Sequence, residues 1–323
     1  MSRAAMLAAL AAAICTHAAW AQTWPAKTVR IIVPHPAGGP IDVPARGAAQ
    51  ELSKIMGEPF IIENRDGADG IIGAEACSKA TDGHTLCVTA SSVISINPLV
   101  REKLSYDPQR DFIPVIYMAA LNSVFVVNPA VKASSMRELL DLGKSSPGKI
   151  TFATFGNTSF GAIFVGWVKA TRDVSFYAIP FKSTIQGLQA AVAGDVQVAS
   201  YAAGAVAPLR SAGKIKALAV TGEKRSMFLP DVPTVREAGV DFDFSAWVGM
   251  FAPSGTPREI AARLNAEVAK LLVQPQFTAQ FISRIGCEVD SHTGKSMEDF
   301  AAFLKSDLEQ TARLIKIAGI QKQ

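Results

Sequence analysis

Short apolar runs alternate with amphipathic segments along most of the chain, and this alternation predicts an α/β protein. The first run consists of the apolar, β-branched residues Val29, Ile31, Ile32 and Val33, which favours a buried strand. Pro34-His35-Pro36 ends it, because proline cannot donate to a sheet ladder. The turn Ala37-Gly38-Gly39-Pro40 follows, and apolar residues then recur at helical spacing over Asp42–Met56. This stretch therefore predicts one strand, one glycine-containing turn and one helix.

The same alternation continues along the rest of the chain, without a tandem repeat or a low-complexity linker. Further strands or extended segments are predicted at Pro59–Glu63, Thr85–Ala90, Phe112–Ala120, Val124–Val127, Ile150–Ala153, Val174–Ile179, Val196–Ser200, Ala217–Thr221 and Phe244–Phe251. Further helices are predicted at Ile71–Ala80, Ser135–Lys144, Phe160–Ala170, Thr184–Ala193, Ala203–Ala212, Pro233–Ala238, Pro257–Leu272 and Met297–Ile317. Asn97–Tyr106 is helical or irregular in this interpretation.

Two of the predicted strand-to-helix turns have the composition of anion-binding sites. Glycine lets the backbone approach a ligand closely, and a helix N-terminus presents free N–H groups and the positive end of the helix dipole. The first turn is Ala37–Pro40, and the second is Thr154–Ser159, where Thr158 or Ser159 can cap the next helix. We expect each turn to hold one end of a carboxylate ligand; an ordinary βα turn is the alternative.

Other polar residues lie near these turns in the predicted fold. Ser91 and Ser92 directly follow a predicted strand, and ligands of open α/β sheets bind at the carboxyl ends of strands. Lys182 and Arg46 could add positive charge, although surface salt bridges are the commoner role of such residues. His35, beside the first turn, could hydrogen-bond a carboxylate or cap the loop.

Composition and charge narrow the function classes. The 323 residues suffice for one large or two medium domains, and the formal net charge is +4 at pH 7. Basic residues are scattered and are not interleaved with aromatic residues, so the sequence gives no support to nucleic-acid binding. No pair of cysteines or histidines has metal-ligand spacing, and we expect neither a metal nor another cofactor.

Residues 1–21 have the parts of a secretory signal peptide. A basic residue, a short apolar stretch and the small residues of Ala19-Trp20-Ala21 follow one another, so Gln22 would begin the mature chain. Cys15 raises a lipoprotein alternative, which the large residue before it disfavours. After cleavage the protein is expected to be soluble and to reside in the periplasm.

An oxidising compartment gives the remaining cysteines a structural meaning. Cys77 lies near the end of a predicted helix and Cys87 in the strand that follows, with the tight turn Thr81–His84 between them. The two sulfurs could meet across that turn, which predicts a Cys77–Cys87 disulfide and leaves Cys287 as a single buried thiol. Three buried, reduced thiols are the alternative.

Six motifs, taken together and in order, resemble those of a known family. They are Pro34-His35-Pro36-Ala37-Gly38-Gly39-Pro40-Ile41-Asp42, Glu63-Asn64-Arg65, Asp82-Gly83-His84-Thr85-Leu86, Leu104-Ser105-Tyr106-Asp107-Pro108, Pro180-Phe181-Lys182 and Leu229-Pro230-Asp231-Val232-Pro233-Thr234. Through them the chain resembles the periplasmic solute-binding proteins of tripartite tricarboxylate transporters, the Bug family, over essentially the whole mature chain. The resemblance implies a monomeric binding protein that captures a small carboxylate and delivers it to the membrane permease subunits.

The resemblance also implies a type II periplasmic-binding fold, in which two α/β lobes are joined by two crossing strands and the ligand lies in the cleft between them. Residues 22–121 with 247–323 would form the first lobe, and residues 122–246 the second. The crossing strands are expected near Leu121–Val124 and Phe244–Val248.

In related proteins the first glycine loop holds one carboxyl end of the ligand, partly through ordered water, and the loop after a second-lobe strand holds the other. These loops correspond here to Ala37–Asp42 and Thr154–Ser159. The candidate ligand-binding residues are His35, Ala37, Gly38, Gly39, Pro40, Asp42, Ser91, Ser92, Phe155, Gly156, Asn157, Thr158, Ser159, Phe181, Lys182, Tyr201 and Trp247.

Departures from the family pattern bear on the ligand. The usual tyrosine after Pro180 is phenylalanine here, the next glycine is Ser183, and Gln197 stands where an acidic residue is usual. A carboxylate that could bind an amino acid's ammonium group is missing from the expected cleft. Aromatic residues that could wall a slot for a flat ring are Phe155, Phe160, Phe181, Tyr201 and Trp247. We therefore expect an aromatic dicarboxylate such as terephthalate; an aliphatic one such as adipate is the alternative, with these aromatic residues in the lobe cores.

Enzymatic motifs give little support to a catalytic function. The sequence has no G-x-S-x-G, H-E-x-x-H or Walker loop. A secreted hydrolase is therefore a distant second class, and a binding partner for a sensor kinase, using the same ligand-induced closure, is a third.

Overall fold

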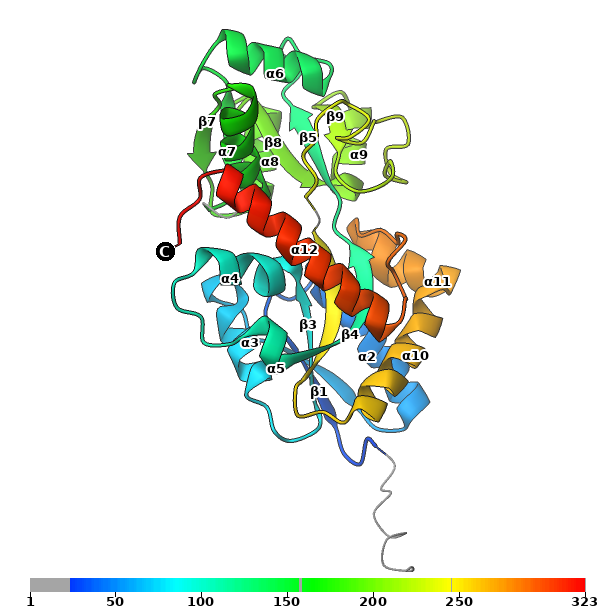
Figure 1. The fold of residues 1–323 in the computed structure, drawn as a ribbon. Coiled ribbons are helices and arrows are strands. Elements are labelled where there is room, and N and C mark those ends of the chain that lie inside the picture. The colour runs from blue at the N-terminus through cyan, green and yellow to red at the C-terminus, as the bar shows by residue number, and fades with distance from the viewer. Residues whose placement is uncertain (1–23, 157–158, 245, 323) are drawn as a thin grey trace, which may run out of the picture.

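Two α/β lobes stacked end to end make up the protein (Figure 1). The computed structural model describes residues 24–156, 159–244 and 246–322. The strands form two five-stranded sheets, one in each lobe. The expected two-lobed α/β fold is thereby confirmed. The predicted signal peptide, Asn157 and Thr158 lie outside the described residues.

Lobe 1 contains the sheet with strand order β2-β1-β3-β10-β4. Its strands are β1 (Val29–Val33), β2 (Phe60–Asn64), β3 (Thr85–Ala90), β4 (Phe112–Ala120) and β10 (Trp247–Pro253). The first three are parallel, and β10 runs antiparallel between β3 and β4. The helices of this lobe are α2 (Asp42–Met56), α3 (Ile71–Ser78), α4 (Asn97–Val100), α5 (Pro108–Asp111), α10 (Arg258–Leu272) and α11 (Pro275–Phe277).

Helices cover both faces of the lobe 1 sheet. Consecutive residues of a strand point to opposite faces, so both sets of side chains are buried in this sheet. Ile31 packs with α2 and α10 residues in one apolar cluster. Ile32, its neighbour, packs with α3 and with Trp247 in another. This arrangement explains why the consecutive residues Ile31, Ile32 and Val33 are all apolar.

Lobe 2 repeats the plan with the strand order β7-β6-β8-β5-β9. Its strands are β5 (Ser123–Val127), β6 (Thr151–Thr154), β7 (Tyr177–Pro180), β8 (Val198–Ala202) and β9 (Lys216–Val220). Its helices are α6 (Met136–Ser145), α7 (Phe160–Arg172), α8 (Thr184–Ala193) and α9 (Ala203–Ser211). Strand β5 is antiparallel to both of its neighbours. The antiparallel inner strand is β10 in lobe 1 and β5 in lobe 2. In each lobe it is the first strand that the chain forms after it crosses from the other lobe.

The two crossings run side by side between the lobes. The first is the short link between β4 and β5, and the second joins β9 to β10. The Leu121 N–H donates a 2.7 Å hydrogen bond to the Ala246 carbonyl. Glu288 braces this region, because its carboxylate accepts from the Asn122 side chain at 3.3 Å and from the Met227 N–H at 3.0 Å.

Helix α12 (Met297–Ile317) runs along both lobes and ends beside α7 (Figure 1). It starts in lobe 1, where the buried Asp307 accepts hydrogen bonds from Ser95 at 2.5 Å and from the indole N–H of Trp247 at 3.0 Å. Its last turn belongs to lobe 2, because Leu314 and Ile315 lie in an apolar cluster of that lobe. The chain therefore makes a third connection between the lobes, in addition to the two crossings.

The structure corrects the sequence prediction in two segments. Residues 233–238 form turns and not a helix: the Thr234 hydroxyl accepts from the Glu237 N–H, the Glu237 carboxylate accepts from the Thr234 N–H, and Gly239 at a φ of 75° ends this single turn. Residues 275–285, for which no element was predicted, form α11 and two further helical turns, η4 (Thr278–Ile282) and η5 (Ser283–Ile285).

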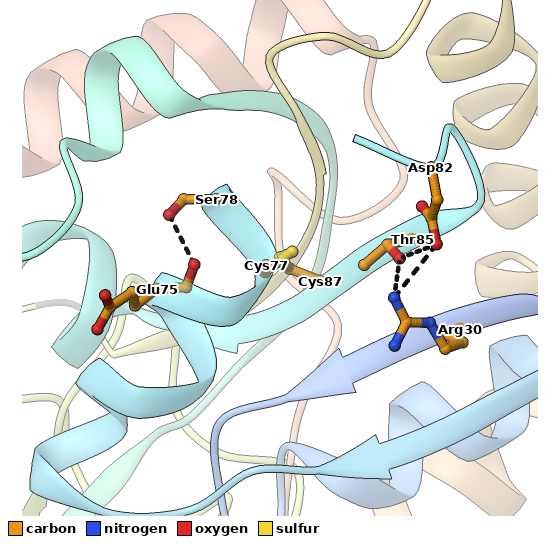
Figure 2. The surroundings of a disulfide bond; sticks show 7 residues. All are labelled: Arg30, Glu75, Cys77, Ser78, Asp82, Thr85 and Cys87. Carbon is orange, nitrogen blue, oxygen red and sulfur yellow. Dashed lines mark hydrogen bonds and ion pairs between the residues drawn. A yellow bond between two sulfur atoms is a disulfide. The ribbon is translucent and has the colours of Figure 1, made fainter. Parts of the chain in front are cut away.

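The predicted disulfide is present. Cys77 on α3 is bonded to Cys87 on β3, with a Cα–Cα distance of 6.2 Å (Figure 2). Cys287 is a buried free thiol, and burial raises its pKa to about 12. The disulfide joins α3 to β3, the strand that comes next in the sequence.

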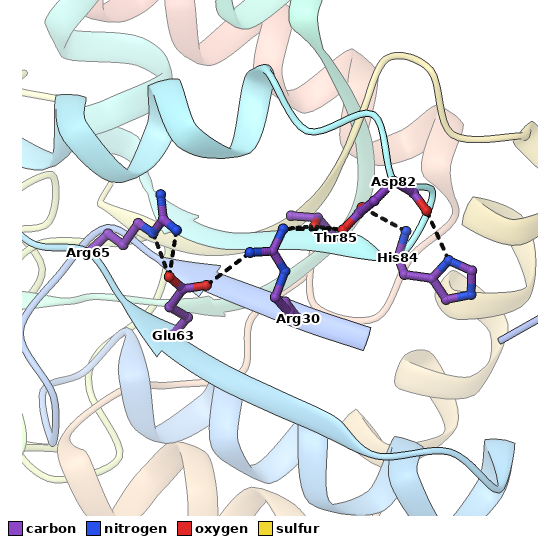
Figure 3. A network of polar contacts seen from close by, with 6 residues as sticks. All are labelled: Arg30, Glu63, Arg65, Asp82, His84 and Thr85. Atoms are coloured by element: carbon purple, nitrogen blue, oxygen red, sulfur yellow. Dashed lines mark hydrogen bonds and ion pairs between the residues drawn. The ribbon is translucent and has the colours of Figure 1, made fainter. Parts of the chain in front are cut away.

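Several of the family motifs serve the lobe 1 sheet (Figure 3). The Arg30 guanidinium on β1 lies 3.5 Å from Glu63 on β2 and 3.2 Å from Asp82 in the turn before β3. The Asp82 carboxylate also accepts from the His84 N–H and from the Thr85 hydroxyl. This network of partly exposed side chains ties the three parallel strands together. Within the described residues no helix is long and apolar enough to cross a membrane.

Candidate functional site

In lobe 2, two helices begin at the carboxyl ends of parallel strands. Helix α7 follows β6 and helix α8 follows β7, and their first residues line a cavity of about 40 Å³ between them. Polar lining residues of this cavity are Thr154, Ser159, Ser183, Thr184 and Ser200. The volume is enough for a group of about the size of a water molecule, and the two helix dipoles favour a negative one.

Ser159 holds the loop at the start of α7. Its hydroxyl accepts from the Ala162 N–H at 3.3 Å and from the Phe155 N–H at 3.0 Å, and it lies 3.0 Å from the Gly156 carbonyl, to which it donates. Gly156 has a φ of 68°, which a side chain would strain. Of the two alternative caps, the structure therefore uses Ser159.

Ser183, which is not among the predicted ligand residues, caps the second helix. Its hydroxyl accepts from the Gln186 N–H at 3.4 Å. The signal was present in the sequence, because a serine before a predicted helix is a typical N-cap. Only the fold shows that α7 and α8 start side by side. Lys182, the predicted ligand residue next to Ser183, is exposed.

In lobe 1, the loop between β1 and α2 is held by Asp42. This side chain is fully buried, and one of its oxygens accepts from the Gly38 N–H at 2.7 Å. Arg46 donates to the same oxygen at 2.7 Å, and Asn64 donates to the other at 2.8 Å. Burial raises the pKa of Asp42, but the hydrogen bonds from Arg46, Gly38 and Asn64 outweigh it and leave the pKa below its ordinary value.

Asp42 therefore stabilises the loop conformation, and its side chain is not accessible to a ligand. Arg46 is committed as well, because its guanidinium also donates to Asn64 at 2.9 Å. Among the described residues, the N–H groups of Gly39 and Ile41 donate no hydrogen bond. These backbone groups, with Gly38 at a φ of 78°, are what the loop can present to an anion.

His35 and the serines after β3 lie deeper than expected. The His35 ring is within 3.4 Å of the Thr89 hydroxyl, and burial lowers its pKa to about 4, so the ring is neutral at pH 7. Its carbonyl accepts from the Asn64 side chain at 3.0 Å. Ser91 is buried, and Ser92 is half-buried at the start of a helical turn. Ala37 and Pro40 are exposed.

The aromatic candidates divide into two groups. Trp247 is fully buried among Tyr117, Phe251 and Phe300, and it does not line the cleft. Phe160 packs on Phe125 with ring centroids 5.0 Å apart; it is partly buried against the lobe 2 core and also lines the lobe 2 cavity. Both rings are needed for packing, as large apolar side chains usually are.

Phe155, Phe181 and Tyr201 remain available for a ligand. Phe155 is 44% exposed and lines the lobe 2 cavity. Phe181 and Tyr201 are half-buried at the edge of a lobe 2 apolar cluster. An exposed phenylalanine beside two helix N-termini presents an apolar face next to an anion site.

A larger cavity, of about 400 Å³, lies between the second crossing and α12. None of the predicted ligand residues lines it. Its acidic lining residues are Glu223, Asp241, Asp243, Asp290 and Asp307. Arg236, which also lines the cavity, pairs with Asp243 at 3.1 Å, so its charge is used by that one carboxylate and the lining as a whole remains acidic. An anionic ligand would be repelled there.

Residues 286–287 link the two candidate half-sites. The Cys287 sulfur lies 3.4 Å from the Pro40 carbonyl of the lobe 1 loop. The preceding Gly286 is so close to lobe 2 that a Cβ on Gly204 would lie 2.9 Å from its Cα. Residues 286–287 therefore contact both the lobe 1 loop and the start of α9, which directly follows β8. No hydrogen bond among the described residues joins the loop at 37–42 to the loop at 154–159.

Comparison with known proteins places this geometry in context. The family model described as the tripartite tricarboxylate transporter family receptor matches residues 44–320. The UPF0065 protein in the gbd 5' region of Cupriavidus necator is 32% identical, over 99% of this chain and 96% of that protein. Protein BugT of Bordetella pertussis is 30% identical, over 93% of this chain and 91% of that protein.

Solved structures agree in fold. An R. palustris protein with adipate superposes with a TM-score of 0.80 at 31% identity, over 93% of this chain and 100% of that chain. MatC from Rhodopseudomonas palustris, with bound malate, has a TM-score of 0.75 at 30% identity, over 90% of this chain and 100% of that chain.

Proposed function

This chain belongs to the receptor family of the tripartite tricarboxylate transporters, and from that premise we propose that it binds a dicarboxylate between its lobes. The family binds small carboxylates and serves membrane transporters. The lobe 2 cavity carries the proposal, because two helix N-termini and their hydroxyl groups converge on it. The free N–H groups of Gly39 and Ile41 in lobe 1 supply the second anion site that a dicarboxylate requires.

The favoured ligand is an aromatic dicarboxylate such as terephthalate. Phe155 supports this choice, because its ring is 44% exposed beside the anion site. Stacking on such a ring contributes about 0.5–1.5 kcal/mol beyond area burial. An aliphatic dicarboxylate is the second candidate, since a structural relative at 31% identity was solved with adipate.

Function would follow from closure of the lobes. A ligand that contacts both lobes stabilises the closed state over the open one, and the closed complex is then what the membrane subunits recognise. We propose that the protein acts as a monomer in the periplasm after removal of residues 1–21 and that it has no catalytic role.

A thermal-shift screen of mono-, di- and tricarboxylates tests the proposal. A ligand at 100 times its dissociation constant adds about 2.7 kcal/mol to the free energy of unfolding, so a true ligand raises the melting temperature measurably. We expect terephthalate to give a larger shift than adipate. The absence of a shift with every carboxylate would contradict the proposed function.

Phe155→Ala separates the two ligand classes. We expect it to weaken terephthalate binding several-fold and to leave adipate binding nearly unchanged, because only the ring gains from stacking. Tyr177→Ala is the matched control, since Tyr177 is also an exposed aromatic residue, 60% accessible, and lies on β7 of the same lobe. Equal losses of affinity for both ligands would show that the Phe155 ring does not stack on terephthalate, which would favour the aliphatic candidate.

A further inference from the structure

The lobe 1 loop lacks an available positive charge of its own. Arg46, the cation on its helix, is paired with the buried Asp42 at 2.7 Å and also bonds Asn64. A ligand carboxylate bound at this loop would contact backbone N–H groups but no uncompensated positive charge, because the charge of Arg46 is already neutralised by Asp42. Removing a carboxylate from water is costly without a compensating partner.

A second cation stands on the other side of the same loop. Arg284 lies on η5 and lines a cavity of about 330 Å³ whose other lining residues are Gly38, Val43, Gln280, Phe281 and Ile285. The Arg284 side chain is exposed, and no residue that the structure describes gives it an ion pair or a hydrogen bond. Its charge is therefore uncommitted.

Packing sets the position of this arginine. Phe281 on η4 fills the space above Gly47 of α2, where any Cβ would collide with its ring, so the η4–η5 segment lies against the start of α2. Two residues beyond Arg284, the chain touches lobe 2 at Gly204. Arg284 is thus held beside the glycine loop, near the boundary between the lobes.

We propose that Arg284 pairs with the ligand carboxylate that the Gly38–Ile41 loop binds, and so contributes to the preference for doubly charged ligands. The guanidinium presents parallel N–H donors that match a carboxylate, and such charge-assisted bonds are about twice as strong as neutral ones. The inference deepens the proposed function and rests on it. Arg284 supplies the charge, and the loop N–H groups fix the orientation.

Binding measurements on Arg284→Gln test the inference, with terephthalate and adipate as probes. We expect calorimetry to show a loss of affinity of about 10- to 100-fold for whichever probe the wild type binds. Arg284→Lys keeps the charge without the paired donors and should lose less. Arg137→Gln is the matched control, because Arg137 is also exposed but lies on α6 at the far end of lobe 2.

Two further readouts distinguish a charge from a structural role. The melting temperature of the ligand-free Arg284→Gln protein should equal that of the wild type, and added salt should weaken binding more in the wild type than in the variant. If Arg284→Gln fails to fold, Arg284→Met, which also removes the charge and keeps a long side chain, carries the same comparison of affinity and salt dependence against the wild type.

The outcomes separate the two proposals. If the wild type binds a dicarboxylate and Arg284→Gln binds it equally well, the role of Arg284 is refuted and the proposed function stands. If the wild type binds no dicarboxylate, the proposed function itself fails.

Discussion

The Gly38 N–H donates a 2.7 Å hydrogen bond to the carboxylate of Asp42, four residues later in the chain. This bond closes the loop between β1 and α2 from the inside, because Asp42 is fully buried. The N–H groups of Gly39 and Ile41, which flank Pro40 in the same loop, donate no hydrogen bond among the described residues. A buried carboxylate thus determines which backbone groups can receive a ligand.

Asp42→Asn should destabilise the protein by about 2 kcal/mol at pH 7, because hydrogen bonds to an ionised group are lost. The amide also turns a donor toward Arg46, Gly38 or Asn64. Denaturant titration of the free energy of unfolding checks this value.

The effect should depend on pH. The pKa of Asp42 in the folded protein is below its ordinary value of 3.8, so the carboxylate contributes stability above that pH and loses it as the pH falls through the folded pKa. The difference between wild type and Asp42→Asn should therefore shrink in acid. A difference that stays constant between pH 7 and pH 3 would show that the charge is not responsible.

Gly38→Ala should weaken ligand binding through the loop conformation. Gly38 has a φ of 78° and no atom within 4 Å of an added Cβ, so the cost is backbone strain of about 1 kcal/mol and not a clash. Gly57→Ala is the matched control, because Gly57 ends the same helix at a φ of 82° and is equally open. Both variants should lose similar stability, and only Gly38→Ala should lose affinity. Parallel losses of affinity would argue against the loop as a binding element.

Ser159→Ala should reduce both stability and binding. It removes an N-cap, which costs about 1 kcal/mol, and it frees the Phe155 N–H that holds the cavity loop. Ser135→Ala removes the cap of α6, where Ser135 accepts from the Glu138 N–H at 3.2 Å, and should cost similar stability. A comparison of dissociation constants decides the matter: the site is elsewhere if Ser159→Ala binds as tightly as Ser135→Ala.

Removing the Cys77–Cys87 disulfide should cost about 2–3 kcal/mol, since the crosslink closes a loop with a sequence separation of 10 residues. Alanine at both positions is the appropriate change because both cysteines are buried. Reductant should lower the melting temperature of the wild type and leave the double variant unaffected. If reductant lowered the melting temperature of both proteins equally, its effect would not come from the Cys77–Cys87 disulfide.

Local patterns predicted most elements and missed a few. The bounds of β1, α2, β3, β4, α8 and α12 agree with the predictions. The helix expected at Pro233–Ala238 was wrong, because Thr234 and Glu237 satisfy each other's N–H groups within one turn and a glycine follows. The η4–η5 segment, with Arg284, had no clear periodic signal.

Side-chain roles were harder to predict than elements. Trp247 follows the second crossing, and its sequence position suggested the cleft. Its indole N–H instead donates to Asp307 on α12, a helix that begins 50 residues later. Asp42 was expected at the ligand, but Asn64 and Arg46 surround it. Burial of this kind depends on residues far apart in sequence.

The alternation of strands and helices, the two glycine-containing turns and the cysteine pair across a short turn follow from local sequence, because they depend on residues that are close in the chain. Three features can be read only from the folded protein: which helix starts lie side by side, which aromatic rings are core, and which of Arg46 and Arg284 keeps a free charge. These depend on contacts between segments that periodicity cannot relate to one another.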